Sequence, residues 1–180
     1  SIDEDIDILM VVHPQDLEQQ TLYAIDQHVM RGGRLMLFVD PNADTQSQQV
    51  IMGTAAIEDL SSDLAPLLRA WGVEYDPERV LADQELALFV TVGEQQRPVT
   101  HLGMIGVQRA GFSNDVVTAR LEIMNMSSVG VLQPIEGAST SFEPLIQSSQ
   151  NSMLMEGEFF TALTDPTILL DEFESDGQRY

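Results

Sequence analysis

The sequence contains no cysteine and no lysine, and each absence removes several classes of enzyme. Without cysteine the chain has no thiolate nucleophile, no disulfide framework and no cysteine-ligated zinc or iron–sulfur site. Without lysine it has no P-loop lysine, no Schiff-base chemistry and no Ser-x-x-Lys arrangement. A Gly-x-Ser-x-Gly elbow and a complete Gly-x-Gly-x-x-Gly loop are missing as well. These absences leave few recognisable routes to catalysis.

Long apolar runs are also missing. No run reaches the roughly 20 residues that a bilayer-spanning helix needs, and no segment has the pattern of a signal peptide. The 180 residues are 43% hydrophobic, which is enough for one compact domain with a real core. Because the chain starts at Ser1 and enters a predicted strand almost at once, we expect it to be a piece of a longer protein.

Basic residues are scarce. The chain has 8 of them, all arginine, against 29 acidic residues, for a formal net charge of −21. Such a surface repels phosphate backbones, which excludes nucleic acid as a partner, and it disfavours direct binding to anionic lipids. The acidity is typical of a solvated surface tuned for solubility, and a cation-binding role is the alternative.

The first forty residues predict a strand, a helix and a second strand. The apolar run at 8–12 lies between acidic residues and a His-Pro pair, as in a central strand. Apolar residues at helical spacing predict a helix from about residue 14 or 16 to residue 30, ended by two glycines. Residues 34–40 predict the second strand. This order predicts a βαβ unit with parallel strands.

Residues 41–59 change character and predict an exposed loop rich in polar side chains. A second helix is expected after the loop, with Asp63 as its N-cap, Pro66 in its first turn and Gly72 at its end. An extended segment and a turn follow, up to residue 83.

The second half of the chain predicts short strands separated by turns, at 85–92, 99–107, 118–125 and 138–143. A helical turn around 156–163 and a frayed polar tail at 171–180 complete the chain. We therefore expect one α/β domain with a parallel, Rossmann-like βαβ core and a mixed or antiparallel β extension. The core takes residues 1–83, the β-rich part 84–150, and a C-terminal segment at 151–180 leads to a linker.

The strongest candidate for a binding site is the carboxyl end of the two predicted strands. Asp40 and Pro41 end the second strand, and His13 ends the first, so His13 and Asp40 would lie close together if the strands are adjacent and parallel. A His–Asp pair can serve general acid–base chemistry, and Asn42 and Asp44 would border the same edge. The alternative is structural, because an aspartate before a proline ends a strand well.

Metal sites have little support in the sequence. His28 falls in the predicted helix and His101 in a predicted strand, and neither has a His-x-x-x-His or His-x-His partner. The acidic run at 3–7 lacks the glycine and the closing glutamate of a calcium loop. We therefore expect no metal, no other cofactor and no catalytic constellation.

Three stretches resemble one family. Residues 7–41, 63–83 and 142–149, beginning "DILMVVHPQDLEQQ", "DLAPLLRAWGVEYD" and "FEPLIQSS", are similar to the extracytoplasmic domain of ABC-transporter auxiliary proteins, a family associated with gliding motility and ABC-2-type transport. The resemblance implies a class I glutamine-amidotransferase-like fold. It also implies a periplasmic location, a parent held in the inner membrane by helices outside this segment, and work beside an ABC permease and its ATPase.

The resemblance also bears on activity. Amidotransferases of that architecture use a cysteine nucleophile, and this chain has none, so the resemblance implies an accessory domain that binds the permease, an envelope protein or a substrate. The alternative is a small-molecule or sugar-binding or hydrolytic enzyme of the same fold, which would use His13, Asp40 and the loop after them.

Overall fold

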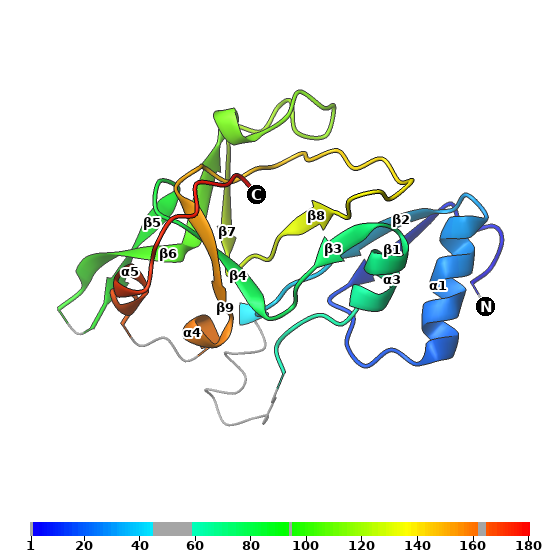
Figure 1. The fold of residues 1–180 in the computed structure, drawn as a ribbon, viewed down its shortest axis with the longest axis horizontal. Coiled ribbons are helices and arrows are strands. Elements are labelled where there is room, and N and C mark those ends of the chain that lie inside the picture. The colour runs from blue at the N-terminus through cyan, green and yellow to red at the C-terminus, as the bar shows by residue number, and fades with distance from the viewer. Residues whose placement is uncertain (1, 45–58, 94, 162–164) are drawn as a thin grey trace.

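The structure, a computed structural model, describes residues 2–44, 59–93, 95–161 and 165–180. Within these residues the strands form four small sheets, one parallel and three antiparallel. Figure 1 shows the first forty residues at one end of the long axis and the hairpin around residues 87–108 at the other. The candidate site lies where the parallel sheet meets the β-rich part.

The parallel sheet pairs β1 (Ile8–Val12) with β2 (Arg34–Phe38), in a register that sets Met10 beside Met36. Helix α1 (Gln19–Met30) connects the two strands, as predicted, and its His28 side chain contacts the Arg34 carbonyl oxygen through Nε2 at 3.2 Å. Both strands of the βαβ unit therefore lie where the sequence places them.

Helix α1 starts later than the sequence predicts. The backbone of His13 has a φ of 46° and that of Asp16 a φ of 49°, so neither residue has helical geometry. The helix therefore begins only at Gln19. At its other end Gly32, with a φ of 89°, supplies the left-handed residue that was expected to end it.

Helix α3 (Ala65–Ala70) follows the second part of the loop. Its N-cap is Leu64, and no side chain caps the helix, so the prediction of Asp63 as N-cap is wrong. The Asp63 backbone N–H instead donates to the Pro14 carbonyl oxygen at 2.8 Å, which ties this loop to the end of β1. At the far end of α3 the Trp71 indole N–H donates to Asp26 of α1 at 3.0 Å, so the two helices adjoin.

The antiparallel sheets join strands that are far apart in the chain. Strand β3 (Val73–Tyr75) pairs with β8 (Leu132–Pro134), and β4 (Arg79–Asp83) pairs with β9 (Ser152–Glu156). The third sheet is consecutive and contains β5 (Ala87–Val92), β6 (Arg97–Gln108) and β7 (Ile123–Ser127). Short helical segments complete the fold: η1 (Arg109–Gly111), α4 (Glu158–Thr161) and α5 (Ile168–Asp171).

Two strand predictions in the second half are wrong. Residues 138–143 form turns and irregular backbone, and the strand expected at 118–125 begins only at Ile123. In the second case, residues 115–121 make turn hydrogen bonds, such as that from the Ala119 N–H to the Asp115 carbonyl oxygen at 2.7 Å. The helical turn expected around 156–163 corresponds to α4.

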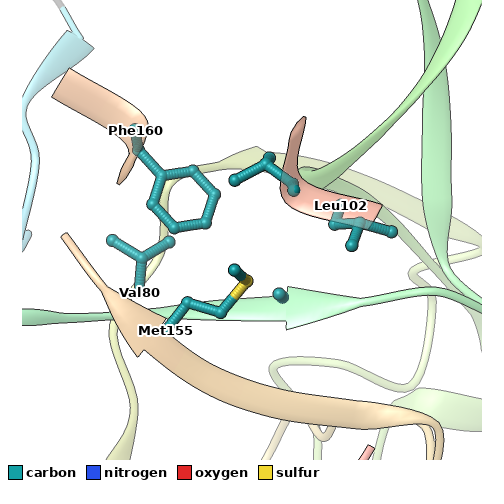
Figure 2. Close-up of a cluster of buried hydrophobic side chains, with 6 residues drawn as sticks. Val80, Leu102, Met155 and Phe160 are labelled. Carbon is teal, nitrogen blue, oxygen red and sulfur yellow. The ribbon is translucent and has the colours of Figure 1, made fainter. Parts of the chain in front are cut away.

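Two apolar clusters cover the two faces of β4. Figure 2 shows the first, in which Val80 of β4 meets Leu102, Met155 and Phe160 from β6, β9 and α4. Leu81, the next residue of β4, belongs to the second cluster. The other buried members of the second cluster are Ile105, Val107 and Phe112. Strand β4 is thus the buried centre of the β-rich part.

The C-terminal tail is bound to this part, contrary to the predicted frayed end. The Tyr180 N–H donates to the Ser148 hydroxyl at 2.8 Å, and the Ser148 N–H donates to the Tyr180 carbonyl oxygen at 2.8 Å. The Tyr180 hydroxyl donates to Asp176, and burial together with that carboxylate raises the pKa of Tyr180 to about 12. The tail therefore packs against the strand that contains Ser152.

The architecture bears on the predicted fold class in one respect. Within the described part of the chain the parallel sheet has two strands, and the remaining sheets are antiparallel. A larger parallel sheet of the Rossmann or amidotransferase kind is not formed by these residues, so that fold class stays a prediction.

Candidate functional site

Ser62 joins the carboxyl ends of β1 and β2. Its hydroxyl oxygen lies 2.8 Å from His13 Nδ1 and accepts a hydrogen bond from the Asp40 N–H at 2.8 Å. The Ser62 N–H in turn donates to the Asp40 carbonyl oxygen at 2.7 Å. Because β1 and β2 are adjacent and parallel, His13 and Asp40 meet here as the sequence suggested, with Ser62 between them.

Ser62 was missed by the sequence analysis because it is 49 residues from His13 in the chain. Its only local signal is the Ser-Ser-Asp stretch before a helix. The Ser62 side chain has no exposed surface, and its oxygen already contacts two groups. A nucleophile must reach its substrate, so this serine holds three chain segments together and does not attack a ligand in this conformation.

Asp40 is half-buried, and its electrostatic surroundings are mixed. Burial raises the pKa of Asp40, and the negative charge of Asp44 adds to this effect. The Asn42 N–H, which donates to Asp40 Oδ1 at 2.9 Å, lowers the same pKa, as does His13. The outcome is a carboxyl group that gains a proton more readily than an exposed aspartate does.

The residues after Asp40 are covered by other parts of the chain. Pro41, Asn42 and Ala43 are all buried, which corrects the prediction of an exposed loop for these positions. Residues 45–58 of the same loop lie outside the described residues. Asp44 accepts a hydrogen bond from the Ser128 hydroxyl at 3.4 Å, so this segment reaches the β-rich part.

Two buried polar atoms near this edge have no hydrogen-bond partner in the described structure. They are Asn42 Oδ1 and the Tyr75 hydroxyl, on residues that are 2% and 5% exposed. Burial raises the pKa of Tyr75, and the negative charge of Asp40 raises it further, so the phenol stays neutral. Gly130 allows close packing here, since a Cβ at that position would lie 3.1 Å from both Pro41 and Tyr75.

An open cleft of about 1060 Å³ lies beside this edge, with Pro41 and Ser62 in its lining. Its walls are strongly acidic. The carboxylates that line it are Asp16, Asp59, Asp63, Glu78, Glu156 and Glu158. Arg79 pairs with Glu156 at 2.7 Å and offsets one of these charges. Such a cleft repels phosphate and carboxylate ligands and attracts cationic groups.

The other histidines have structural surroundings. His28 is buried against the start of β2. His101 Nδ1 accepts a hydrogen bond from the Gly103 N–H at 3.2 Å, and burial lowers the pKa of His101. Over the described ranges, no group of three or more His, Asp or Glu side chains has the geometry to hold a metal ion.

Comparison with known families places the chain. A family model described as "ABC-type uncharacterized transport system" matches residues 1–180, so the chain belongs to this family of ABC-type transport auxiliary proteins. No curated protein and no solved structure matches the chain. None of the described helices is both long enough and apolar enough to cross a membrane.

Proposed function

We propose that this chain is a non-catalytic accessory domain of an ABC-type transport system, where it contacts the permease, the ATPase or an envelope partner. The match of the family model over residues 1–180 carries this proposal. The resemblance described above adds the finer expectations: a periplasmic domain of a membrane-anchored parent, in a system related to those of gliding motility. The acidic surface supports binding to a protein over binding to nucleic acid or lipid.

The geometry of the candidate site supports a role without catalysis. The Ser62–His13 contact resembles part of a nucleophile–base pair, but Ser62 is fully buried and accepts a hydrogen bond from the Asp40 backbone. His13, Asp40 and Ser62 thus fix the strand ends and the loop before α3. The chain has no cysteine or lysine to replace them as a nucleophile.

Affinity purification of the full-length parent from gently solubilised membranes tests this function. We expect an ABC permease and its ATPase to be recovered in near-stoichiometric amounts, as judged by quantitative mass spectrometry. The control is the parent with the segment corresponding to residues 1–180 deleted, which should recover less of both subunits. Recovery of a parent without any transporter subunit would contradict the proposal.

A second candidate function is binding or hydrolysis of a small molecule or sugar at the same edge. The acidic cleft beside Ser62 and the two unpartnered polar atoms of Asn42 and Tyr75 favour it. Under this hypothesis the paired replacements His13→Ala and Asp40→Ala abolish binding of cationic or neutral sugar probes, measured by calorimetry. The control Asp76→Ala, at an exposed turn, should leave binding intact. Probe binding that survives the paired replacement in a folded protein would exclude this candidate.

A further inference from the structure

The outer face of the parallel sheet is apolar and exposed. Alternate residues of a strand point to the same side of a sheet, and the register aligns Met10 with Met36 and Val12 with Phe38. The five apolar residues of this face are between 46% and 62% exposed: Ile8, Met10, Val12, Met36 and Phe38. We call them the β1–β2 face. The residues between them, such as Leu9 and Leu35, are half-buried on the opposite side.

A parallel sheet is normally covered on both faces, because its strands are linked by helices that pack on the sheet. Here α1 lies against the opposite side, where His28 contacts the start of β2. Burying a contiguous apolar face is favourable by about 25 cal/mol per Å². The β1–β2 face is therefore built to pack against a further element.

Negative charge flanks both ends of the β1–β2 face. At the start of β1 lie the exposed carboxylates of Asp3, Glu4, Asp5 and Asp7, against the two arginines Arg31 and Arg34. At the other end lie Asp40 and Asp44. With a net charge of −21, a second copy of this chain would be repelled, and so would an anionic lipid surface. The occupant complementary to this surface carries apolar side chains together with lysine or arginine.

We infer that the β1–β2 face binds an amphipathic helix of a separate polypeptide, with an apolar stripe toward the sheet and lysine or arginine at its ends. A helix suits the surface because helices are what cover the faces of parallel sheets. A five-residue strand is ~16 Å long, which about 11 helical residues span. The two methionines at the centre of the face adapt their shape to such a partner. This inference deepens the proposed function by naming the surface and the kind of partner.

Photo-crosslinking in the full-length parent tests the inference. A benzophenone amino acid replaces Val12, which is 61% exposed at the end of the face, and a control replaces Val116, which is 90% exposed in a turn elsewhere. We expect Val12 to crosslink to another polypeptide in intact membranes, within a helical segment that carries an apolar stripe and lysine or arginine. The control position should not reach that segment.

Matched substitutions define the chemistry of the contact. Met10→Gln with Met36→Gln removes the apolar character of the face at nearly constant shape and charge, and we expect the Val12 crosslink to fall about tenfold. Met30→Gln makes the same exchange at a methionine that is 69% exposed on α1, and it should leave the crosslink unchanged. Because all three methionines are exposed, each variant should melt at the parent temperature.

The possible outcomes separate this inference from the proposed function. A Val12 crosslink within the parent itself, to a second copy or to lipid would overturn the inference, as would no crosslink while a permease and ATPase still co-purify. A crosslink to a basic amphipathic helix, found without any co-purifying transporter subunit, would keep the inference and reject the proposed function.

Discussion

Asp83 shows how this chain accommodates a charged group in its core. The side chain has no exposed surface, and its two oxygens accept hydrogen bonds from the Ser149 N–H at 2.7 Å and the Ser149 hydroxyl at 2.8 Å. The backbone N–H groups of Glu85 and Leu86 add bonds of 3.0 and 2.9 Å. One carboxylate therefore fixes the turn between β4 and β5 and joins it to the loop before β9.

Replacing Asp83 with alanine should destabilise the protein by about 3 kcal/mol, because four donors lose their acceptor and three of them belong to the backbone. Urea denaturation measures this loss. Asp76→Ala is the matched control, since Asp76 also accepts a backbone N–H two residues on, from Glu78 at 3.0 Å, but is exposed. We expect a loss below about 1 kcal/mol for the control. Equal losses would show that burial of Asp83 is not what matters.

His101 should make stability depend on pH. Burial lowers the pKa of His101 below its ordinary value of 6.5, so the folded protein favours the neutral ring. Above pH 6.5 neither state binds the proton and the full stability is present. As the pH falls below 6.5, the unfolded chain binds the proton first, and stability is lost until the folded pKa is passed.

His101→Gln removes this linkage. The unfolding free energy of the original protein relative to the variant should therefore decrease between about pH 7.5 and about pH 5. Parallel urea titrations of the two proteins measure the difference, in which the effects of all other groups cancel. A difference that stays constant or grows on acidification would contradict the assignment.

At the scale of elements, the packing of α4 on β6 depends on one glycine. A Cβ on Gly103 would lie 2.4 Å from Phe160 Cε1, which is closer than real side chains approach. Phe160 is itself 7% exposed and belongs to the cluster in Figure 2. The two residues should therefore be coupled in their effect on stability.

Gly103→Ala should cost about 2 kcal/mol, because the Phe160 ring must move inside a packed core. In a protein that already carries Phe160→Leu, the same substitution should cost less than about 1 kcal/mol, since a smaller side chain leaves room. Denaturation of the four proteins of this double-mutant cycle measures the coupling. Additive losses would mean that the close approach of Gly103 and Phe160 carries no energy.

The elements that the sequence predicted well are those defined by local patterns. Strands β1 and β2 are short apolar runs with clear boundaries, and α1 has a helical apolar stripe ended by Gly32. Strand β9 was not predicted, because its partner β4 lies far away in the chain and supplies the environment that makes it a strand. The start of α1 was misplaced because the positive φ angles of His13 and Asp16 have no signature in these residue types.

The candidate site shows the same limit. His13 and Asp40 could be placed together by the rule that parallel strands end at one edge, whereas Ser62 could not, because only the folded chain brings it to them. The burial of Pro41, Asn42 and Ala43 was also missed. Polar residues in a predicted loop suggest exposure, and contact with the β-rich part reverses this for these three positions.

For the whole molecule, self-repulsion should limit stability. The net charge is −21, and ion pairs in the described ranges join only Arg31 to Glu4 at 3.9 Å and Arg79 to Glu156 at 2.7 Å. Added salt screens repulsion among the remaining carboxylates, so the melting temperature should rise with ionic strength.

Raising NaCl from about 0.05 M to about 0.5 M should increase Tm by a few degrees, since about 1 kcal/mol corresponds to ~2–4 °C in a chain of this size. KCl at the same ionic strength should act equally, because screening does not depend on which cation is present. Scanning calorimetry in both salts measures this. A variant with Asp3→Asn, Glu4→Gln and Asp5→Asn should gain less from salt. A response to only one cation would indicate a specific cation site.

The pairing of β4 with β9 also determines when the chain can fold during synthesis. Residues 80–83 leave the ribosome long before their partner strand at 152–156 exists, yet these four residues are buried in the finished protein. In the interval the apolar side chains of β4 have only incomplete cover, and long-range pairing of this kind forms slowly. We therefore expect the nascent β-rich part to depend on chaperones until β9 emerges, whereas the β1–α1–β2 unit can assemble as soon as it is made.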